Sequence, residues 1–294
     1  MAYSSAAAPS IHPLPAISRI LFPTDFSPCS KAAIPYACAI AKSYGAELRV
    51  VNVVGPQPLV GPMGVPYTDP EQQDETARRQ LRMLVDSTDF HSIKLQHSVH
   101  RGSVSDTLCR IVEEDRCDLL VVGTHGRHGV KQFVMGSVAE ELFRRVSCPV
   151  LTVGPGARKP VDRNVQFRRI LFATDLSEAS TKILHYVESL AHVTDAELVV
   201  FHAVPDSRDA TFDDRLAAAK RRLAELMPKG VAKTDTSLKV GQPAELIVET
   251  ASQRECDLIV IGARRGPRLA AHVPWAVAHE VVCAAPCPVM TVGH

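Results

Sequence analysis

Three glycines and a serine stand at a spacing that suits a phosphate-binding loop. An apolar run ends at Gly123, Gly126 follows, and Gly136 and Ser137 come after nine intervening residues, which gives the pattern G-x2-G-x9-G-S. Glycine has no Cβ, so its backbone can approach a phosphate group closely. Gly136 and Ser137 would open a helix, whose unpaired N–H groups and positive dipole end attract an anion. We therefore predict a phosphate site here; the alternative is that the glycines serve tight turns alone.

Four basic or imidazole side chains lie inside this glycine pattern: His125, Arg127, His128 and Lys131. They either neutralise the charge of a phosphate group or are simply solvated, and both interpretations stay open. The chain contains no G-x-x-x-x-G-K-[ST] motif, so the predicted site would lack the lysine of a P-loop.

A carboxylate stands just after the first apolar strand, in the segment Pro23–Asp25. Ligands of open parallel sheets bind at the carboxyl ends of the strands, where the strand order reverses. Asp25 would lie beside that crevice, where it could accept ribose hydroxyl groups; the alternative is a turn-forming role ahead of Ser27. Arg101 and Gly102 follow the third strand and could also approach the ligand, although a turn is the simpler role for Gly102.

Hydrophobic periodicity predicts the elements that position these residues. In the first part of the chain we expect strands near 18–22, 47–54, 93–100, 118–123 and 149–153, and helices near 28–44, 70–89, 104–116 and 137–146. Ser27 followed by Pro28 favours a helix start. The strands are apolar on both faces, which is typical of parallel sheets covered by helices on both sides. The fold class is therefore α/β, with a doubly wound, five-stranded parallel sheet in the order 3-2-1-4-5.

This unit occurs twice in the 294 residues, which suits two domains of ordinary size. Residues 19–54 align without gaps on 169–204, and residues 117–154 align on 256–293. Between these blocks the second copy is shorter by 11 residues. We expect a disordered tail over 1–16, a first domain over 17–154, a linker over 155–168 and a second domain over 169–294.

The second copy departs from the glycine pattern. Gly262 keeps the first glycine, but Arg265 takes the place of the second, Trp275 of the third and Ala276 of the serine. A tryptophan ring would fill the phosphate position, and alanine lacks the hydroxyl group. Asp175 persists at the position of the carboxylate. We expect this copy to bind no ATP. Its arginines could still bind an anion of another kind.

The first copy resembles the ATP-binding branch of the universal stress protein family. The resemblance is carried by Ile20–Ser27, Val51–Val54, the glycine pattern, and the segments 136–141 and 148–153, and it covers nearly the whole chain, twice. It implies a five-stranded parallel sheet and ATP as the ligand, with Mg²⁺ as the accompanying ion. It also implies that Asp25 contacts the adenosine part, that the Val53 backbone lies beside the adenine, and that the glycine pattern holds the phosphates. The residues assigned to ATP are Pro23, Thr24, Asp25, Val53, Gly123, His125, Gly126, Arg127, Gly136, Ser137 and Val138.

Composition and charge limit the classes of function. The net charge is +1, so no field favours nucleic acid or an anionic membrane. The apolar runs of about six residues are too short for a membrane helix, which needs about 20, and the first residues do not form a signal peptide. The eight cysteines fall mostly inside apolar elements and form no C-x-x-C pair, which indicates a reducing compartment such as the cytoplasm.

We predict an ATP-binding stress-response protein that acts as a sensor or switch. The alternatives are a slow ATPase or self-phosphorylating enzyme, and an interaction scaffold in which the nucleotide is structural. No evident general base or metal-binding carboxylate pair stands beside the glycine pattern, so turnover ranks below binding. The fifth strands, Val150–Val153 and Val289–Val292, form apolar sheet edges that should pair. We favour pairing inside the chain, because the tether raises the effective concentration; the alternative is a homodimer of tandems.

Overall fold

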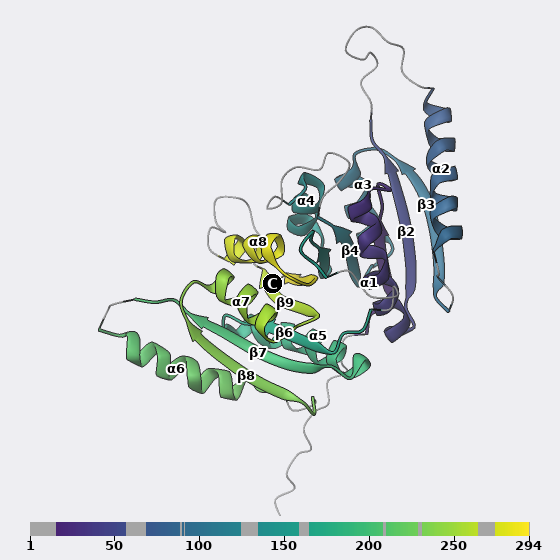
Figure 1. Cartoon of the computed structure of the whole chain (residues 1–294). Helices are drawn as coiled ribbons and strands as arrows, with labels where there is room; N and C mark the ends of the chain where they lie inside the picture. Colours follow the sequence, from purple (N-terminus) through teal and green to yellow (C-terminus); the bar gives the residue numbers. More distant parts are fainter. Residues whose placement is uncertain are drawn as a thin grey trace, which may run out of the picture.

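One ten-stranded mixed sheet runs through the chain in the computed structural model (Figure 1). The structure describes residues 16–56, 69–88, 90, 92–124, 135–158, 165–207, 210–228, 231–263 and 274–293. Within this part of the chain, no helix is long and apolar enough to cross a membrane.

The first copy of the repeat contributes the first half of the sheet. Its elements are β1 (Arg19–Pro23), α1 (Pro28–Tyr44), β2 (Glu47–Val54), α2 (Pro70–Ser87), β3 (Lys94–Arg101), α3 (Val104–Glu114), β4 (Leu119–Gly123), α4 (Ser137–Arg145) and β5 (Val150–Val153). Every expected strand and helix is present, and the ends differ from the sequence-based expectation by at most two residues.

The second copy repeats the same series. Its elements are β6 (Arg169–Ala173), α5 (Glu178–Thr194), β7 (Glu197–Val204), α6 (Phe212–Glu225), β8 (Thr234–Val240), α7 (Pro243–Gln253), β9 (Leu258–Ala263), α8 (Pro274–Ala284) and β10 (Val289–Gly293). The sheet order is β3-β2-β1-β4-β5-β10-β9-β6-β7-β8. Each copy therefore has the predicted parallel order 3-2-1-4-5, and the doubly wound fold is confirmed.

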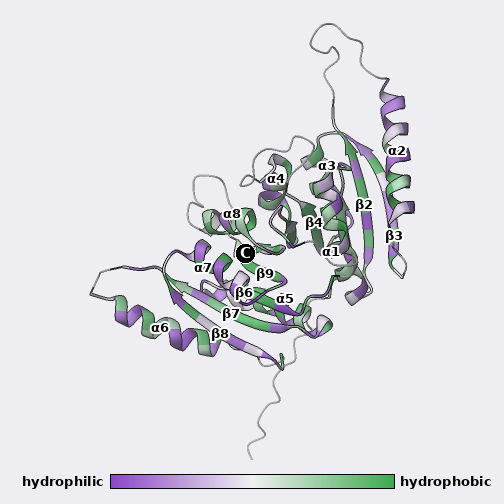
Figure 2. Cartoon of the chain, viewed as in Figure 1, coloured by the Kyte–Doolittle hydropathy of each residue, from purple (hydrophilic) through white to green (hydrophobic). Residues whose placement is uncertain are grey.

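Helices cover both faces of the sheet, and each face carries a core that continues from one copy into the other. One core takes apolar side chains from α1, α2, α5 and α6, and the other takes them from α3, α4, α7 and α8. The central strands are buried on both faces, as their apolar runs predict. Helix α2 buries only a narrow apolar stripe of Ala77, Leu81 and Leu84, and most of its remaining surface is hydrophilic (Figure 2).

The cap of α1 fixes the chain where it leaves the first strand. Ser27 is the N-cap, and its hydroxyl oxygen accepts a hydrogen bond from the Ser30 N–H at 3.1 Å. Pro28 occupies the first helical turn, where no backbone donor is needed. The predicted helix start is confirmed, and it sets the position of the loop that carries Asp25.

The two parallel sheets join through β5 and β10, which pair antiparallel. Leu151 lies opposite Met290, and both side chains are buried. Threonine hydroxyls add two matching bonds: Thr152 Oγ1 donates to the Val289 carbonyl at 2.9 Å, and Thr291 Oγ1 donates to the Val150 carbonyl at 3.2 Å. The predicted pairing of the two edges inside one chain is confirmed.

A second contact between the copies lies on the face covered by α1 and α5. The Tyr44 and Ser189 hydroxyl groups are 3.0 Å apart, and the Tyr36 hydroxyl donates at 2.7 Å to the carbonyl of Arg158, in the segment that links the copies. The two copies thus contact each other on the helical face as well as through the sheet.

Candidate functional site

The loop after β1 is held by a set of short hydrogen bonds centred on Thr24. Its N–H donates to the Val51 carbonyl at 2.8 Å, and its carbonyl accepts from Asn52 Nδ2 at 2.7 Å. Its hydroxyl oxygen accepts from the Phe26 N–H at 3.0 Å and lies 3.1 Å from Ser30 Oγ. Thr24 is buried, so it positions the loop by binding the end of β2 and the start of α1.

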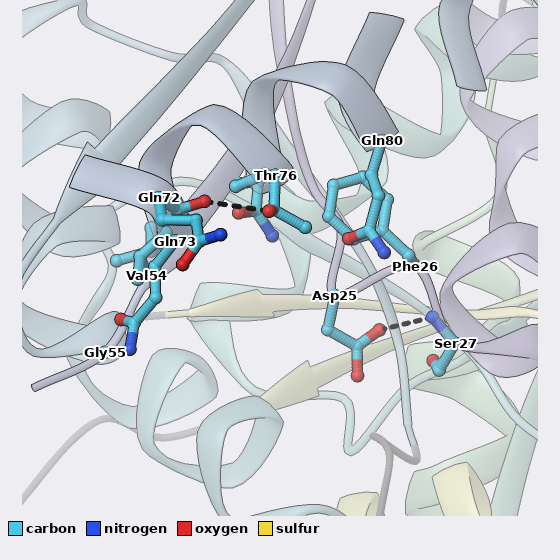
Figure 3. Close-up of a pocket in the computed structure, with 12 residues that line it drawn as sticks. Asp25, Phe26, Ser27, Val54, Gly55, Gln72, Gln73, Thr76 and Gln80 are labelled. Atoms are coloured by element: carbon cyan, nitrogen blue, oxygen red, sulfur yellow. Dashed lines mark hydrogen bonds between the residues drawn. The ribbon is translucent and has the colours of Figure 1, made fainter. Parts of the chain in front are cut away.

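Asp25 caps a turn and also faces a pocket. Its Oδ1 accepts the Ser27 N–H at 3.0 Å, so the turn-forming role is present. Partial burial acts to raise the pKa of Asp25, but hydrogen bonds from Ser27 and Ser30 outweigh it and leave that pKa below its usual value. Asp25 is therefore ionised at neutral pH, and Figure 3 shows its carboxylate at the pocket wall.

The backbone of this loop is strained in both copies. Phe26 has φ of 64°, and Leu176 at the aligned position has φ of 59°, in the left-handed region that side chains other than glycine rarely adopt. Because the second copy shares this conformation without the glycine pattern, the strain belongs to the fold of the loop.

A pocket of about 730 Å³ opens at the carboxyl edge of the sheet. It is formed by the loop after β1, the end of β2 and one face of α2 (Figure 3). Its walls are Asp25, Phe26, Ser27, Asn52, Val53, Val54, Gly55, Gln72, Gln73, Thr76, Ala77 and Gln80. Asp25 and Val53, which the sequence singles out, therefore share one cavity.

The α2 wall of this pocket was missed by the sequence analysis. Gln72, Thr76 and Gln80 follow one another at intervals of four residues, so they lie along one helical face. In Figure 3 the Gln80 side chain extends from α2 toward the loop that carries Asp25. That spacing of polar residues was a usable signal, but the sequence does not show which face of α2 turns toward the sheet edge.

Arg101 does not line the pocket, but its side chain holds α2, which forms one wall of the pocket. Its guanidinium donates to the Pro70 carbonyl at 2.6 Å and pairs with Asp74 at 2.7 Å, both in the first turns of α2. Gly102 has φ of 141°, and its N–H donates to the Val54 carbonyl, which makes it the turn glycine expected after β3.

Gly123 has a packing role that the sequence did not reveal. A Cβ at this position would lie 2.6 Å from the Cys29 carbonyl oxygen, so only glycine lets the first turn of α1 come this close. The aligned Gly262 is kept in the second copy although the rest of the glycine pattern is lost. Close packing is thus a sufficient reason for glycine at position 123.

The start of α4 lies on the other side of β1 from α2. Gly136 is its N-cap and donates its own N–H to the Thr124 carbonyl at 2.6 Å. The next N–H groups, of Ser137 and Val138, belong to the first turn, where the helix itself supplies no acceptor. Both residues are exposed, so these donors can meet a ligand. His125, Gly126, Arg127, His128 and Lys131 lie outside the described residues.

The second copy builds the loop after its first strand in the same way. His202 replaces Asn52, and its Nδ1 lies 2.7 Å from the Thr174 carbonyl oxygen. Asp175 Oδ1 accepts both the Ser177 N–H and the Ser180 hydroxyl at 2.9 Å. The carboxylate loop is therefore common to the two copies, whereas the glycine pattern of the sequence is kept only in the first. Arg264, Arg265, Arg268 and the side chain of Trp275 are outside the described part of the chain.

Comparison with known proteins gives one family for both copies. The model of the "Universal stress protein family" matches residues 16–154 and again residues 166–293. A universal stress protein of Methanocaldococcus jannaschii is 31% identical over 137 residues, which cover 46% of this chain and 81% of that protein. One of Synechocystis is 23% identical over 300 aligned positions, covering 94% of this chain and 99% of that protein.

A solved structure shares the fold of the whole tandem. The crystal structure of a universal stress protein from Archaeoglobus fulgidus has a TM-score of 0.72 and 20% identity, and the match covers 94% of this chain and 98% of that chain. The likeness supports the arrangement of two such units in one chain, at the level of the fold.

Proposed function

The chain belongs to the universal stress protein family, and we propose that its first copy binds one ATP molecule and that the protein acts as a nucleotide-dependent sensor or switch. The observation that carries the proposal is the pocket between the loop after β1, the end of β2 and α2. Its volume of about 730 Å³ lies within the range of small-molecule sites, roughly 300–1,000 Å³.

The adenosine part of ATP suits this pocket. The ionised Asp25 can accept hydrogen bonds from the ribose hydroxyls, and the backbone around Val53 lies at the wall where a base can stack. Gln80 brings an amide, which pairs a donor with an acceptor as the N6/N7 edge of adenine requires. Pro23 and Thr24 act indirectly in this assignment, because they hold the loop that carries Asp25.

The phosphates suit the start of α4, across β1 from the nucleoside pocket. The first-turn N–H groups of Ser137 and Val138, the Ser137 hydroxyl and the positive end of the helix dipole would bind the anion. Gly136 shapes the entry to the helix, and Gly123, Gly126, His125 and Arg127 complete the proposed phosphate site by family resemblance. The nucleotide would thus lie across the carboxyl edge of the sheet at the β1/β4 reversal of strand order.

Mg²⁺ would accompany the phosphates as part of the ligand. Among the described residues, no group of three or more histidine, cysteine, aspartate or glutamate side chains is placed to hold a metal ion. The ion would take most of its ligands from phosphate oxygens and from water, which Mg²⁺ commonly retains.

Binding rather than turnover is the favoured activity. The two carboxylates of α4 are each paired within the helix: Glu140 with Arg144 at 2.8 Å and Glu141 with Arg145 at 2.6 Å. A carboxylate in an ion pair is a poor general base for activating water. All eight cysteines carry thiols, which supports a cytoplasmic location for this sensor.

The direct test is the nucleotide content of the purified full chain. Denaturation followed by mass spectrometry should release an adenine nucleotide, and calorimetry on the stripped protein should show ATP binding. Incubation with ATP should release no phosphate above the buffer control. If the stripped, folded chain binds neither ATP nor ADP, the proposed function is wrong.

A further inference from the structure

The start of α4 is tied to the junction between the two copies. The Gly136 N–H donates to the Thr124 carbonyl at 2.6 Å, and the Thr124 N–H donates to the Val153 carbonyl at 3.2 Å. Val153 is the last residue of β5, the strand that pairs with β10 of the second copy. Two hydrogen bonds therefore connect the N-cap of α4 to the edge strand at the junction.

Helix α8 of the second copy meets the residues that follow β5. A Cβ on Gly154 would lie 3.1 Å from the Val282 carbonyl oxygen, and a Cβ on Gly156 would lie 2.8 Å from that of Ala285. The Arg158 N–H donates to the Pro286 carbonyl at 3.0 Å. The segment after β5 is thus held backbone to backbone along the C-terminal end of α8, with no room for side chains between them.

The same helix also meets the residue that precedes the N-cap of α4. Met135 is 3% exposed and belongs to the apolar core that includes Val281 and Val282. Burial raises the pKa of the Cys283 thiol, while a hydrogen bond from the Met135 backbone and the nearby Glu140 charge act on it in opposite directions. The Cys283 thiol, which also lies 4.0 Å from His279 Nε2 on the same helix, is therefore close to the Met135 backbone and to Glu140 of α4.

We propose that α8 of the second copy positions the N-terminus of α4, so that the copy without the glycine pattern builds part of the phosphate end of the nucleotide site in the other copy. Val282 and Cys283 are the positioning residues, and they act through Gly154 and Met135. The inference rests on the proposed function, because it assigns a role toward the same ATP. It also gives the second copy a role that does not need a nucleotide of its own.

The nucleoside and the triphosphate of ATP would bind on opposite sides of β1. The adenosine pocket lies between β1, β2 and α2, on the side of β1 that faces away from β5 and α8. A substitution that displaces α8 should therefore weaken binding of the triphosphate and leave binding of the nucleoside unchanged. Damage to the fold as a whole would weaken both.

The test is calorimetry of the full chain with ATP and, separately, with adenosine. Cys283→Phe places a ring against Met135 and should weaken ATP binding about tenfold or more, with adenosine binding changed less than about twofold. Cys283→Ser keeps the size of the side chain and should bind both ligands like the parent. Ser189→Phe, which enlarges a buried residue at the α1–α5 contact between the copies, should have no effect specific to ATP.

Hydrogen exchange on the parent protein gives a second measurement that needs no variant. ATP should slow amide exchange in residues 277–284 of α8, and adenosine at saturation should not. The inference is overturned if a folded Cys283→Phe chain keeps parental ATP affinity, if ATP and adenosine weaken together, or if ATP leaves exchange in α8 unchanged. If the parent binds adenosine but not ATP, or neither ligand, the proposed function fails as well, which distinguishes the two failures.

Discussion

Asn52 and Thr24 are joined by a 2.7 Å hydrogen bond, in which the Asn52 amide donates to the Thr24 carbonyl. The second copy keeps the link with another side chain, since His202 Nδ1 lies 2.7 Å from the Thr174 carbonyl oxygen. The end of the second strand therefore fixes the carboxylate loop in both copies. A carboxylate in this loop is a property of the fold, and the ability to bind a nucleotide must depend on what surrounds it.

Asp25→Asn should weaken ATP binding about tenfold or more, because hydrogen bonds to a charged group contribute about 1.5–3 kcal/mol. The asparagine oxygen can still accept the Ser27 N–H, so the turn should survive. Asp175→Asn is the matched control in the second copy and should leave ATP affinity unchanged. Calorimetric titration of the three proteins measures the difference. Equal losses from both substitutions would contradict the assignment of the site to the first copy.

The charge of Asp25 also predicts a pH dependence. Its folded-state pKa lies below the ordinary value of 3.8, so the carboxylate stabilises the fold fully above that value. The contribution is lost as the pH falls through the folded-state pKa. The stability difference between the parent and Asp25→Asn should thus be constant from about pH 5 to 8 and shrink in stronger acid. Urea unfolding across this range checks the sign, and a difference that grows in acid would refute it.

Gly123→Ala should destabilise the fold by about 1–3 kcal/mol, the usual cost of overpacking. The added methyl group would lie 2.6 Å from the Cys29 carbonyl oxygen, and neither backbone can move without shifting α1 or β4. Gly55→Ala is the control, because a Cβ there meets nothing within 4 Å, and it should change stability by less than about 0.5 kcal/mol. Equal urea midpoints for the two variants would show that close packing does not explain Gly123.

The junction between the copies should show energetic coupling. Leu151→Ala and Met290→Ala should each cost about 2–5 kcal/mol, because both side chains are buried. Their combination should deviate from additivity by at least about 0.5 kcal/mol, since the residues lie opposite each other in β5 and β10. Leu108 faces the other core, so Leu151→Ala with Leu108→Ala should be additive. A double-mutant cycle by urea unfolding that finds the junction pair strictly additive would contradict this.

The elements and their order were predictable because the signals are local. The apolar runs of β1, β4 and β5 and the Ser27-Pro28 start of α1 lie where the sequence places them. Pairing of β5 with β10 was predictable because both strands form apolar sheet edges and belong to one chain. Asp25 was expected both at a turn and at a ligand, and it occupies the turn and the pocket wall together.

The rest depends on contacts between distant segments, which a single sequence does not show. Gln80 lines the pocket only because α2 turns that face toward β2, and Arg101 reaches α2 across a separation of more than 20 residues. The reason for Gly123 is the backbone of α1, which no local pattern reveals. The nearness of Cys283 on α8 to the Met135 backbone depends on how the two copies pack.

Gly136→Trp copies the second domain into the first and should abolish ATP binding while adenosine still binds. The ring would occupy the space in front of the Ser137 and Val138 N–H groups at the start of α4. Ser137→Ala removes only the hydroxyl donor and should weaken ATP binding less, by about 0.5–3 kcal/mol. Calorimetry with both ligands separates the effects. Parental ATP affinity in Gly136→Trp would place the phosphates elsewhere.

The central claim is that one nucleotide binds per chain, in the first copy. Calorimetric titration of the stripped full chain with ATP measures it most directly. A stoichiometry near one that falls to zero in Gly136→Trp is the predicted result. Two equivalent sites per chain, or a single site that persists unchanged in Gly136→Trp, would contradict it.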